Sequence, residues 1–270
     1  MKPAPFDHVH ATDVAHAVAL LQSCDSARLL AGGHSLLPLM AMRQTTPTLL
    51  VDLGRIRSLA GIRDLGTHLE IGAMTRHRDV ETSPLAQQHL PLLVAALHRV
   101  GYVTVRNRGT LGGSVANADP AAEAPSVLVA LDGEMLAEGP AGPRVIPAAE
   151  FFRGPGLTAL SADEILTGLR IPKQPAGTVV SVHEFARRNC GWALVGAYGA
   201  ATYENGRLTD LRLSLSGVGV VPFRAHEPTV EAVVAGVDPV DHIHGSAAYR
   251  RRLAGVLTRR CLQDLVEGTS

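Results

Sequence analysis

Aromatic residues and net charge are what the sequence most clearly lacks. Phe, Tyr and Trp together make up 4% of the 270 residues, too few for a surface on which nucleobases stack. Lys and Arg number 25, and Asp and Glu also number 25, so no overall positive field attracts nucleic acid or an anionic membrane. Although 46% of the residues are hydrophobic, no apolar run approaches the roughly 20 residues of a membrane-spanning helix. We therefore expect neither nucleic acid nor a membrane span.

Cysteine is scarce as well. The three cysteines, Cys24, Cys190 and Cys261, lie far apart and form no C-x-x-C pair, so the chain supplies neither an iron–sulfur cluster nor a zinc site from its thiols. Isolated cysteines in odd number are typical of reduced thiols. The N-terminus also lacks the basic, apolar and small-residue pattern of a secretory signal. Both observations predict a cytoplasmic protein.

The common nucleotide fingerprints and catalytic constellations are also absent. No G-x-G-x-x-G opens a helix and no G-x-x-x-x-G-K-[ST] occurs, which disfavours a Rossmann or P-loop domain. No Ser-His-Asp arrangement, paired-carboxylate site or molybdopterin site stands out, so we predict no catalytic residue in this chain. His8/His10 and His242/His244 have a spacing that could chelate a metal from a strand. No third ligand accompanies either pair in the sequence, and we predict no metal site.

Two glycine-rich stretches are present instead. Residues 106–123, RNRGTLGGSVANADPAAE, form a turn-rich run between apolar segments, and residues 31–40, AGGHSLLPLM, follow the strand-like Arg28-Leu29-Leu30. Glycine lets a ligand approach the main chain, and successive backbone amides in such turns suit a phosphate. Two separate stretches are what a ligand with a central pyrophosphate needs, although ordinary surface turns remain the alternative for either one alone.

The two stretches together resemble a known family. Residues 31–38 and 106–114 are similar to the FAD-binding medium subunit of the molybdenum hydroxylases, the carbon monoxide dehydrogenase and xanthine dehydrogenase family. The opening Met1–Phe6 and the closing Tyr249–Ala254 resemble that subunit too, so the similarity spans nearly the whole chain. It implies an α+β protein with a two-part FAD-binding domain of the vanillyl-alcohol-oxidase (PCMH) type.

We expect the FAD-binding domain to span residues 1–174 and a small α+β C-terminal domain to span 175–270. A small βαβ unit at about 1–57 precedes a mixed, antiparallel α+β unit at about 58–174, and Pro172–Gly177 is the expected linker. Thr12 and Thr75 are expected to begin helices, residues 89–100 to form a helix that ends at Gly101, and residues 109–123 to form a loop. In the C-terminal part, Asn205-Gly206 predicts a hairpin between strands at 193–203 and 208–221, and residues 246–266 predict a helix.

The resemblance also implies which residues hold FAD. The first stretch is expected to contact the pyrophosphate mainly through its backbone, the second through its glycines and hydroxyls, and Glu123 to meet the adenosine ribose. Leu166 and Trp192 are expected to border the flavin ring. The expected FAD contacts are Leu29, Leu30, Ala31, Gly32, Gly33, His34, Ser35, Leu36, Gly109, Thr110, Leu111, Gly112, Gly113, Ser114, Asn117, Glu123, Leu166 and Trp192.

The sequence departs from the family pattern in a few places. The family often has Asp where this chain has Glu123, and an acid where this chain has Gly191. The xanthine dehydrogenase branch has a Lys near Ala186, for which Arg187 is the available substitute. The environment of Trp192 is the feature that these departures affect most.

The implied function is electron transfer in a larger assembly. A large partner subunit would carry the molybdopterin cofactor, and a small one two [2Fe–2S] clusters that pass electrons to FAD on this chain. An external acceptor such as NAD, a quinone, a cytochrome or oxygen would then take them, in a heterohexamer built as a dimer of heterotrimers. Two alternatives are a stand-alone FAD-dependent oxidoreductase and a non-catalytic assembly protein that has lost flavin.

Overall fold

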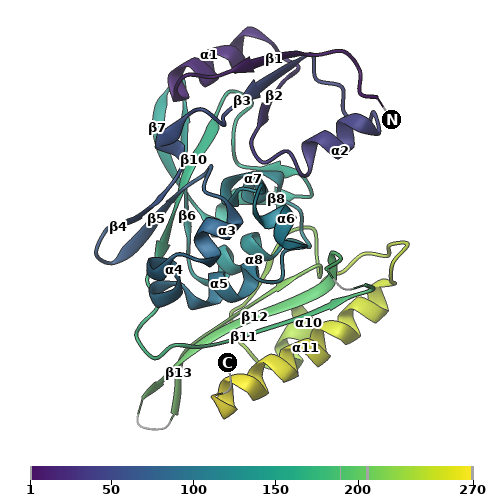
Figure 1. The fold of residues 1–270 in the computed structure, drawn as a ribbon. Helices are drawn as coiled ribbons and strands as arrows, with labels where there is room; N and C mark the ends of the chain where they lie inside the picture. Colours follow the sequence, from purple (N-terminus) through teal and green to yellow (C-terminus); the bar gives the residue numbers. More distant parts are fainter. Residues whose placement is uncertain (1, 189, 205–206, 269–270) are drawn as a thin grey trace.

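Three parts, each with a sheet and helices, follow one another along the chain and along the molecule (Figure 1). The structure is a computed structural model that describes residues 2–188, 190–204 and 207–268. The first part lies at one end in Figure 1, the second in the middle, and the third, with the long C-terminal helix, at the other end. None of the described helices combines the length and the hydrophobicity needed to cross a bilayer.

The first part is a parallel three-stranded sheet flanked by helices. Its strand order is β1-β3-β2, and β3 pairs in parallel with both neighbours. The βαβ prediction is confirmed, but Asp13 caps the first helix in place of Thr12, because the Asp13 carboxylate accepts a hydrogen bond from the His16 amide. The elements are β1 (Asp7–His10), α1 (Val14–Ser23), β2 (Ala27–Leu30), α2 (Leu36–Ala41) and β3 (Leu49–Asp52).

The middle part is built on an antiparallel sheet of order β4-β5-β10-β6-β7, as the alternating pattern predicts. The central strand β10 alternates least in burial, because helices cover one of its faces and part of α1 approaches it from the first unit. The strands and the 3-10 turn of this part are η1 (Arg57–Leu59), β4 (Ile62–Asp64), β5 (His68–Gly72), β6 (Glu134–Gly139), β7 (Gly142–Pro147), the two-stranded pair β8 (Phe152–Gly154) and β9 (Leu157–Thr158), and β10 (Ile165–Pro172).

Short helices cover the middle sheet, and their bounds correct three predictions. Thr75 does not begin a helix, since its hydroxyl bonds the backbone of Gly61. The helix expected at 89–100 is shorter: α5 begins at Pro91 and ends at Leu97, with His98 and not Gly101 after its last turn, and a separate proline-started helix, α4, precedes it. The loop expected at 109–123 contains a helix. The bounds are α3 (His77–Glu81), α4 (Pro84–His89), α5 (Pro91–Leu97), α6 (Val103–Arg106), α7 (Leu111–Asn117), α8 (Glu123–Ala130) and α9 (Ala148–Phe151).

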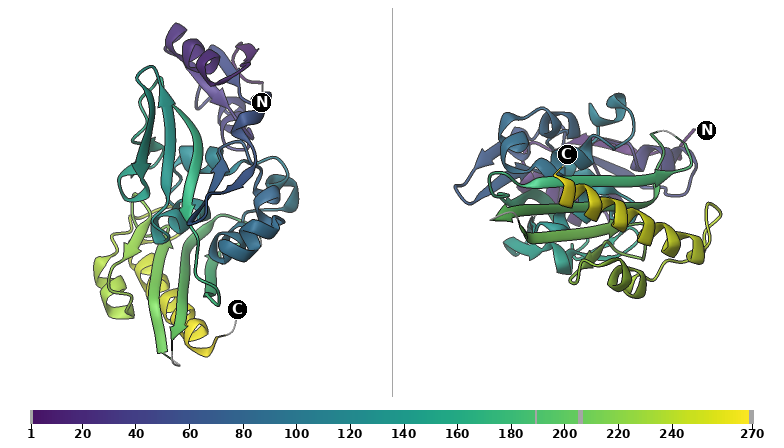
Figure 2. Two further views of the ribbon diagram at one scale, coloured as in Figure 1. Left: turned by 90° about the vertical axis from the view of Figure 1, so that its left-hand side faces the viewer. Right: turned by 90° about the horizontal axis from the view of Figure 1, so that it is seen from below.

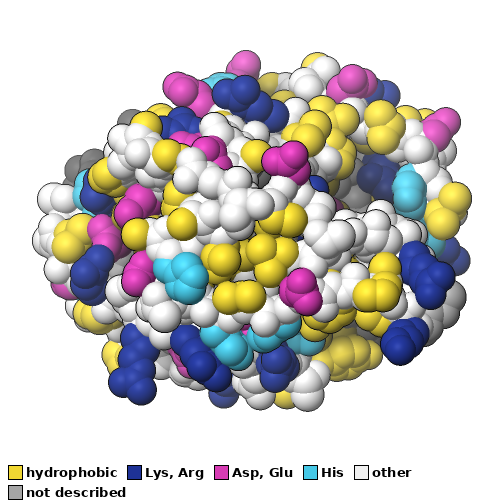
Figure 3. All heavy atoms as spheres, turned by 90° about the horizontal axis from the view of Figure 1, so that it is seen from above, with side chains coloured by type: hydrophobic (Ala, Val, Ile, Leu, Met, Phe, Trp, Pro, Cys, Tyr) yellow, Lys and Arg dark blue, Asp and Glu magenta, His cyan; other side chains and the backbone are white. Residues whose placement is uncertain are grey.

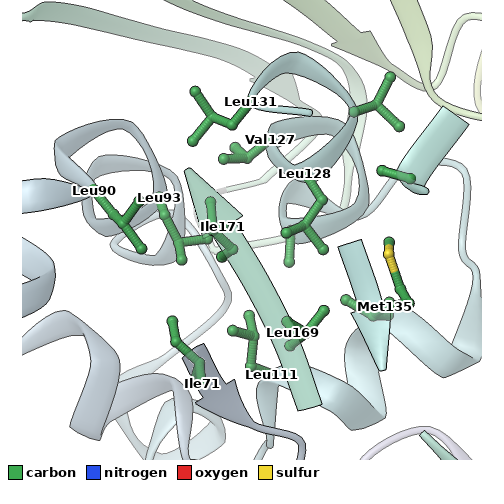
Figure 4. Close-up of a cluster of buried hydrophobic side chains, with 14 of the residues drawn as sticks. Ile71, Leu90, Leu93, Leu111, Val127, Leu128, Leu131, Met135, Leu169 and Ile171 are labelled. Carbon is green, nitrogen blue, oxygen red and sulfur yellow. The ribbon is translucent and has the colours of Figure 1, made fainter. Parts of the chain in front are cut away.

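Helix α8 lies at the centre of the core that the middle and C-terminal parts share. All its residues from Ala124 to Ala130 are buried, which is expected of a helix that is covered on every side. Figure 4 shows Val127 and Leu128 facing the core between the helices and β10, where Leu169 and Ile171 lie. The same core cluster includes Tyr198 and Ala200 of the third part, so the middle and C-terminal parts are packed into one core.

The third part is an antiparallel sheet of order β11-β12-β13-β14, with a long helix on one face (Figure 2). The predicted helix at 246–266 is confirmed, with Ser246 as its N-cap. The two long strands form the predicted hairpin, whose turn at Asn205-Gly206 lies outside the described residues. The elements are β11 (Val179–Ala186), β12 (Ala193–Glu204), β13 (Arg207–Ser216), β14 (Phe223–Ala225), α10 (Val230–Gly236) and α11 (Ala247–Glu267).

The other face of this sheet packs on the middle part through α5 and α8. The Ser214 hydroxyl donates to the Ser126 carbonyl of α8 at 2.7 Å, and the Gly217 amide donates to the Pro120 carbonyl at 2.8 Å. Both bonds are within the boundary between the two parts, where an unpaired polar group would be costly. The C-terminal sheet is therefore fixed on the segment that leads into α8.

Candidate FAD-binding site

The first glycine stretch is a turn between β2 and α2 whose amides lack acceptors within the described chain. Gly33 has a φ of +78°, a left-handed conformation that favours glycine. Within the described chain, the amides of Gly32, Gly33, His34 and Ser35 donate no hydrogen bond. Backbone amides need an acceptor, and consecutive free amides in a turn are suited to an anion. This turn fits a phosphate group.

The second glycine stretch is built differently from the expectation. Thr110 is the N-cap of α7, and its hydroxyl accepts a hydrogen bond from the Gly113 amide at 3.1 Å. The Leu111 amide donates to the Thr75 carbonyl and the Gly112 amide to the Ala73 carbonyl, both at 2.9 Å. The Ser114 amide donates to the Thr110 carbonyl at 3.0 Å. These amides are already engaged, so this stretch offers a ligand its shape and side chains more than free backbone donors.

The structure brings the two stretches into direct contact. A Cβ added to Gly32 would lie 2.5 Å from the Arg108 carbonyl oxygen and 2.8 Å from the Gly109 Cα. A Cβ added to Gly113 would lie 3.4 Å from the Ala31 Cβ. Only glycine at position 32 allows the two main chains to approach this closely. Two stretches that are far apart in the sequence thus form one surface.

A buried histidine that the sequence analysis did not single out, His77, lies beside this contact. The amide of His77 donates to the Gly109 carbonyl at 3.0 Å, and a Cβ on Gly109 would lie 2.8 Å from the His77 ring. Burial, reinforced by Arg106 and His34, lowers the pKa of His77 to about 4, so the imidazole is neutral at neutral pH. Its Nδ1 atom is buried and has no hydrogen-bond partner among the described residues.

Arg106 fixes the backbone that leads into the second glycine stretch. Its Nε donates to the Glu81 carboxylate at 3.1 Å, and its Nη1 donates to the carbonyls of Val100 and Gly101 at 3.1 and 3.0 Å. A guanidinium with several fixed acceptors orders the backbone around it. Arg106 therefore positions residues 107–110 against the first turn.

Glu123 is the first residue of α8 and lies in an acidic cluster. Burial, reinforced by Glu184 and Asp119, raises the pKa of Glu123 to about 8, while part of the side chain stays accessible. Burial also raises the pKa of Glu184, whose carboxylate accepts a hydrogen bond from the buried Tyr198 hydroxyl at 2.9 Å. Glu184 and Tyr198 come from the C-terminal sheet, and no sequence pattern pointed to either.

The two residues expected at the flavin ring differ in exposure. Leu166 is 5% exposed and packs in the main core from β10, whereas Trp192 is 87% exposed and forms no ring contact within the described chain. Trp192 lies two residues before Leu194, and the Leu194 carbonyl lies next to Gly217. The Gly217 amide donates a hydrogen bond to the carbonyl of Pro120, which lies just before Glu123 in the chain. Trp192 is thus at the same end of the C-terminal sheet as Glu123. The other expected residues, Ser114 and Asn117, are half-buried on α7.

Comparison with known proteins decides the family. A family model described as the FAD binding domain in molybdopterin dehydrogenase matches residues 4–174. The chain belongs to the FAD-binding subunits of the molybdenum hydroxylases.

Relatives of known activity match this FAD-binding subunit along almost their whole length. The alpha subunit of the 6-hydroxypseudooxynicotine dehydrogenase complex of Paenarthrobacter nicotinovorans is 37% identical, over 97% of this chain and 95% of the relative. The carbon monoxide dehydrogenase medium chain of Hydrogenophaga pseudoflava is 34% identical, over 97% of both chains. Quinoline 2-oxidoreductase from Pseudomonas putida 86 has a structure that matches with a TM-score of 0.94, at 32% identity over 99% of both chains.

The fold agrees with this assignment. The structure of carbon monoxide dehydrogenase from Hydrogenophaga pseudoflava covers 100% of both chains with a TM-score of 0.96 and 34% identity. The molecule is therefore an oxidoreductase subunit with a mixed α+β fold that binds FAD and works in a multi-subunit complex with large and small partner subunits. Its residues fit the cofactor through the four free amides and the close glycine contact described above.

Proposed function

We propose that the first glycine turn holds the FAD pyrophosphate through the amides of residues 32–35. The observation that carries this proposal is the group of free amides in a turn that packs directly on the second glycine stretch. Gly109, Thr110, Leu111, Gly112 and Gly113 shape the floor of the site by packing, and Ser114 and Asn117 supply polar side chains to it. The flanking Leu29, Leu30, Ala31 and Leu36 hold the turn between strand and helix.

The remaining contacts belong to the two ends of FAD. Glu123 is proposed to accept hydrogen bonds from the adenosine ribose, and Leu166 and Trp192 to border the flavin ring. The exposure of Trp192 supports its role, since a large aromatic side chain with no ring contact in the described chain is free to stack on a planar ligand. Leu166 would act through the shape of the buried wall that it forms with β10.

The chain's own part in the reaction is binding and orientation. When bound, FAD would supply the electron-transfer chemistry between the [2Fe–2S] clusters of the small partner subunit and an external acceptor. The free amides orient the cofactor, the apolar wall excludes water from one side, and the neutral His77 keeps a positive charge away from the glycine contact. None of these tasks needs a general acid or base.

We also propose the wider organisation of the protein. The separate sheets built from β1–β3, β4–β10 and β11–β14 support domain boundaries at positions 57 and 174 and the two-part PCMH type. The assembly is proposed to be a dimer of heterotrimers with the large molybdopterin and small [2Fe–2S] subunits, in the cytoplasm. The free thiols of Cys24 and Cys261 are compatible with a reducing compartment.

Histidine, acidic, basic and apolar side chains are interspersed on the face in Figure 3.

Purification separates this proposal from its alternatives. Expressed with its partner subunits, the chain should co-purify with polypeptides that carry molybdenum and iron, and with one FAD per chain measured by absorbance after release. A stand-alone oxidoreductase would carry FAD without partners. An assembly protein without flavin would co-purify with partners and no FAD, and that result would overturn the proposed site.

A further inference from the structure

We propose that His8, His10 and Asp52 form a binding site for a divalent transition-metal cation such as Zn²⁺ on the first sheet. The parallel register places His10 directly opposite Asp52, and His8 lies two residues earlier on the same face of β1. One ligand atom from each residue lies within 4.8 Å of the other two. Sequence spacing showed only the histidine pair, because the third ligand comes from a different strand, β3.

The distances match those of a metal site. His8 Nε2 and His10 Nδ1 lie 3.1 and 3.3 Å from the same carboxylate oxygen, Asp52 Oδ2. A tetrahedral ion with bonds of about 2.0 Å separates its ligand atoms by about 3.3 Å. Two imidazoles and a carboxylate are a ligand set that Zn²⁺ accepts, with a fourth position left for water.

Two further contacts support a cation over a simple hydrogen-bonded pair. His10 Nδ1 is buried and has no hydrogen-bond partner among the described residues, although it lies 3.3 Å from Asp52 Oδ2, and a cation bound by both atoms would satisfy it. The other carboxylate oxygen, Asp52 Oδ1, accepts a hydrogen bond from the Gly54 amide at 2.7 Å. Such a second contact fixes the orientation of a metal-binding carboxylate and leaves Oδ2 for the ion.

The bound ion would join an edge strand to the centre of its sheet. β1 is an edge strand and β3 is the central strand, which pairs with β1 on one side and with β2 on the other. On the β2 side, Leu30 lies opposite Asp52. Leu30 immediately precedes the first glycine stretch. A metal at this position stabilises the unit that carries the turn, because an ion that binds only the folded state raises its stability.

The test uses the full chain without affinity-tag histidines, treated with EDTA and dialysed into metal-free buffer. With Zn²⁺ as the probe, we expect one equivalent bound at micromolar concentration, measured by equilibrium dialysis and atomic emission. We also expect a rise in melting temperature of at least about 3 °C at saturating Zn²⁺. Co²⁺ should give the intense visible bands of a tetrahedral complex.

Matched variants make the result specific to these residues. Asp52→Asn and His10→Asn should each weaken Zn²⁺ binding at least about tenfold. The double variant His242→Ala/His244→Ala is the control, since that pair has the same spacing and rings 5.0 Å apart but belongs to no three-ligand cluster of the described residues. It should leave binding within twofold. If Asp52→Asn fails to fold by circular dichroism, the partly exposed His8→Asn replaces it.

The proposal is overturned by absence of stoichiometric Zn²⁺ binding, by variants at positions 8, 10 and 52 that bind as the natural chain does, or by loss of binding in the control pair. FAD content is measured in parallel. Because the variants lie outside the proposed FAD contacts, loss of metal binding in these variants supports the metal site whether or not the chain holds FAD as proposed.

Discussion

Different physical constraints require glycine at the different glycine positions of the site. Gly33 needs a left-handed backbone, whereas Gly32 does not and is glycine because another main chain lies where its Cβ would be. Gly112 is confined in the same way, since its Cβ would lie 2.4 Å from the Ala73 Cβ. The Gly32 contact joins the two stretches, so a substitution there tests their coupling without a backbone-dihedral effect.

Gly32→Ala is therefore expected to reduce FAD affinity at least about tenfold and to lower the free energy of unfolding by about 1–3 kcal/mol. The added Cβ would push the first turn away from Arg108 and Gly109. Fluorescence titration of FAD-free protein and urea unfolding measure the two effects. Gly219→Ala is the control, because its Cβ would meet only ordinary contacts at 3.6 and 3.9 Å. Equal FAD affinity in both variants would contradict the role of the glycine contact.

Glu123 makes the FAD-free protein pH-sensitive. Its folded-state pKa of about 8 lies above the ordinary value of 4.5, so the folded chain keeps the proton over a range in which the unfolded chain has released it. The contribution of Glu123 to stability therefore falls as pH rises from about 4.5 to about 8 and changes little above that, by an amount on the order of a few kcal/mol. Ionisation of Glu123 in the folded state is the unfavourable step.

Glu123→Gln should remove this dependence, because the amide has no charge to bury. We expect the FAD-free variant to be more stable than the natural chain at pH 8.5 and about equally stable at pH 5, as measured by urea unfolding. Glu150→Gln, at an exposed acid, should show no such pH-dependent gain. A Glu123→Gln effect of the same size at both pH values would be evidence against the buried, protonated carboxyl.

At the scale of elements, α7 shows why the second stretch was predicted as a loop. Two successive glycines disfavour a helix, and the sequence offers no amphipathic period to oppose them. The helix forms because Thr110 caps it and because Ala73 and Thr75 accept hydrogen bonds from its first amides. Ala73 and Thr75 lie much earlier in the chain, in the segment that follows β5. Their contact with α7 is known only from the folded structure.

Thr110→Ala is expected to destabilise the protein by about 1 kcal/mol, since the Gly113 amide would lose its acceptor at a nearly buried position. Thr110→Ser keeps the oxygen and should recover most of the loss. Thermal unfolding of both variants gives the comparison, and FAD titration shows whether a loosened α7 weakens the cofactor. Equal destabilisation by Ala and Ser would mean that the methyl packing of Thr110, and not its cap, matters.

The sequence predicted the elements whose pattern is local. The βαβ order up to Leu53, the antiparallel middle sheet and the helix beginning after Ser246 all follow from periodicity and capping, and the structure confirms them. It did not predict Glu184 beside Glu123, or Asp52 beside the His8/His10 pair. Each of these clusters depends on register or on packing between parts, which no single stretch of sequence contains.

At the scale of the whole molecule, the expected linker at Pro172–Gly177 is more ordered than its composition suggests. The Lys173 ammonium lies 2.7 Å from an Asp64 carboxylate oxygen, and the Lys173 amide donates to the Thr67 carbonyl. Gln174 is 8% exposed, and its side-chain carbonyl accepts a hydrogen bond from the Leu92 amide at 3.0 Å. The chain between the middle and C-terminal parts is held by the middle part, so the two are not joined like independent domains.

Limited proteolysis of the FAD-free chain should reveal this order. Trypsin is expected to cleave first after the exposed Arg187, near the highly exposed Trp192, and only later after Lys173, whose amide and ammonium are both bonded to the middle part. Mass spectrometry of the first fragments identifies the bond. Asp64→Asn removes the ion pair of Lys173 and should speed cleavage there without changing the rate at Arg187. Early release of a fragment that ends at Lys173 from the natural chain would instead show that this connection opens independently of the fold.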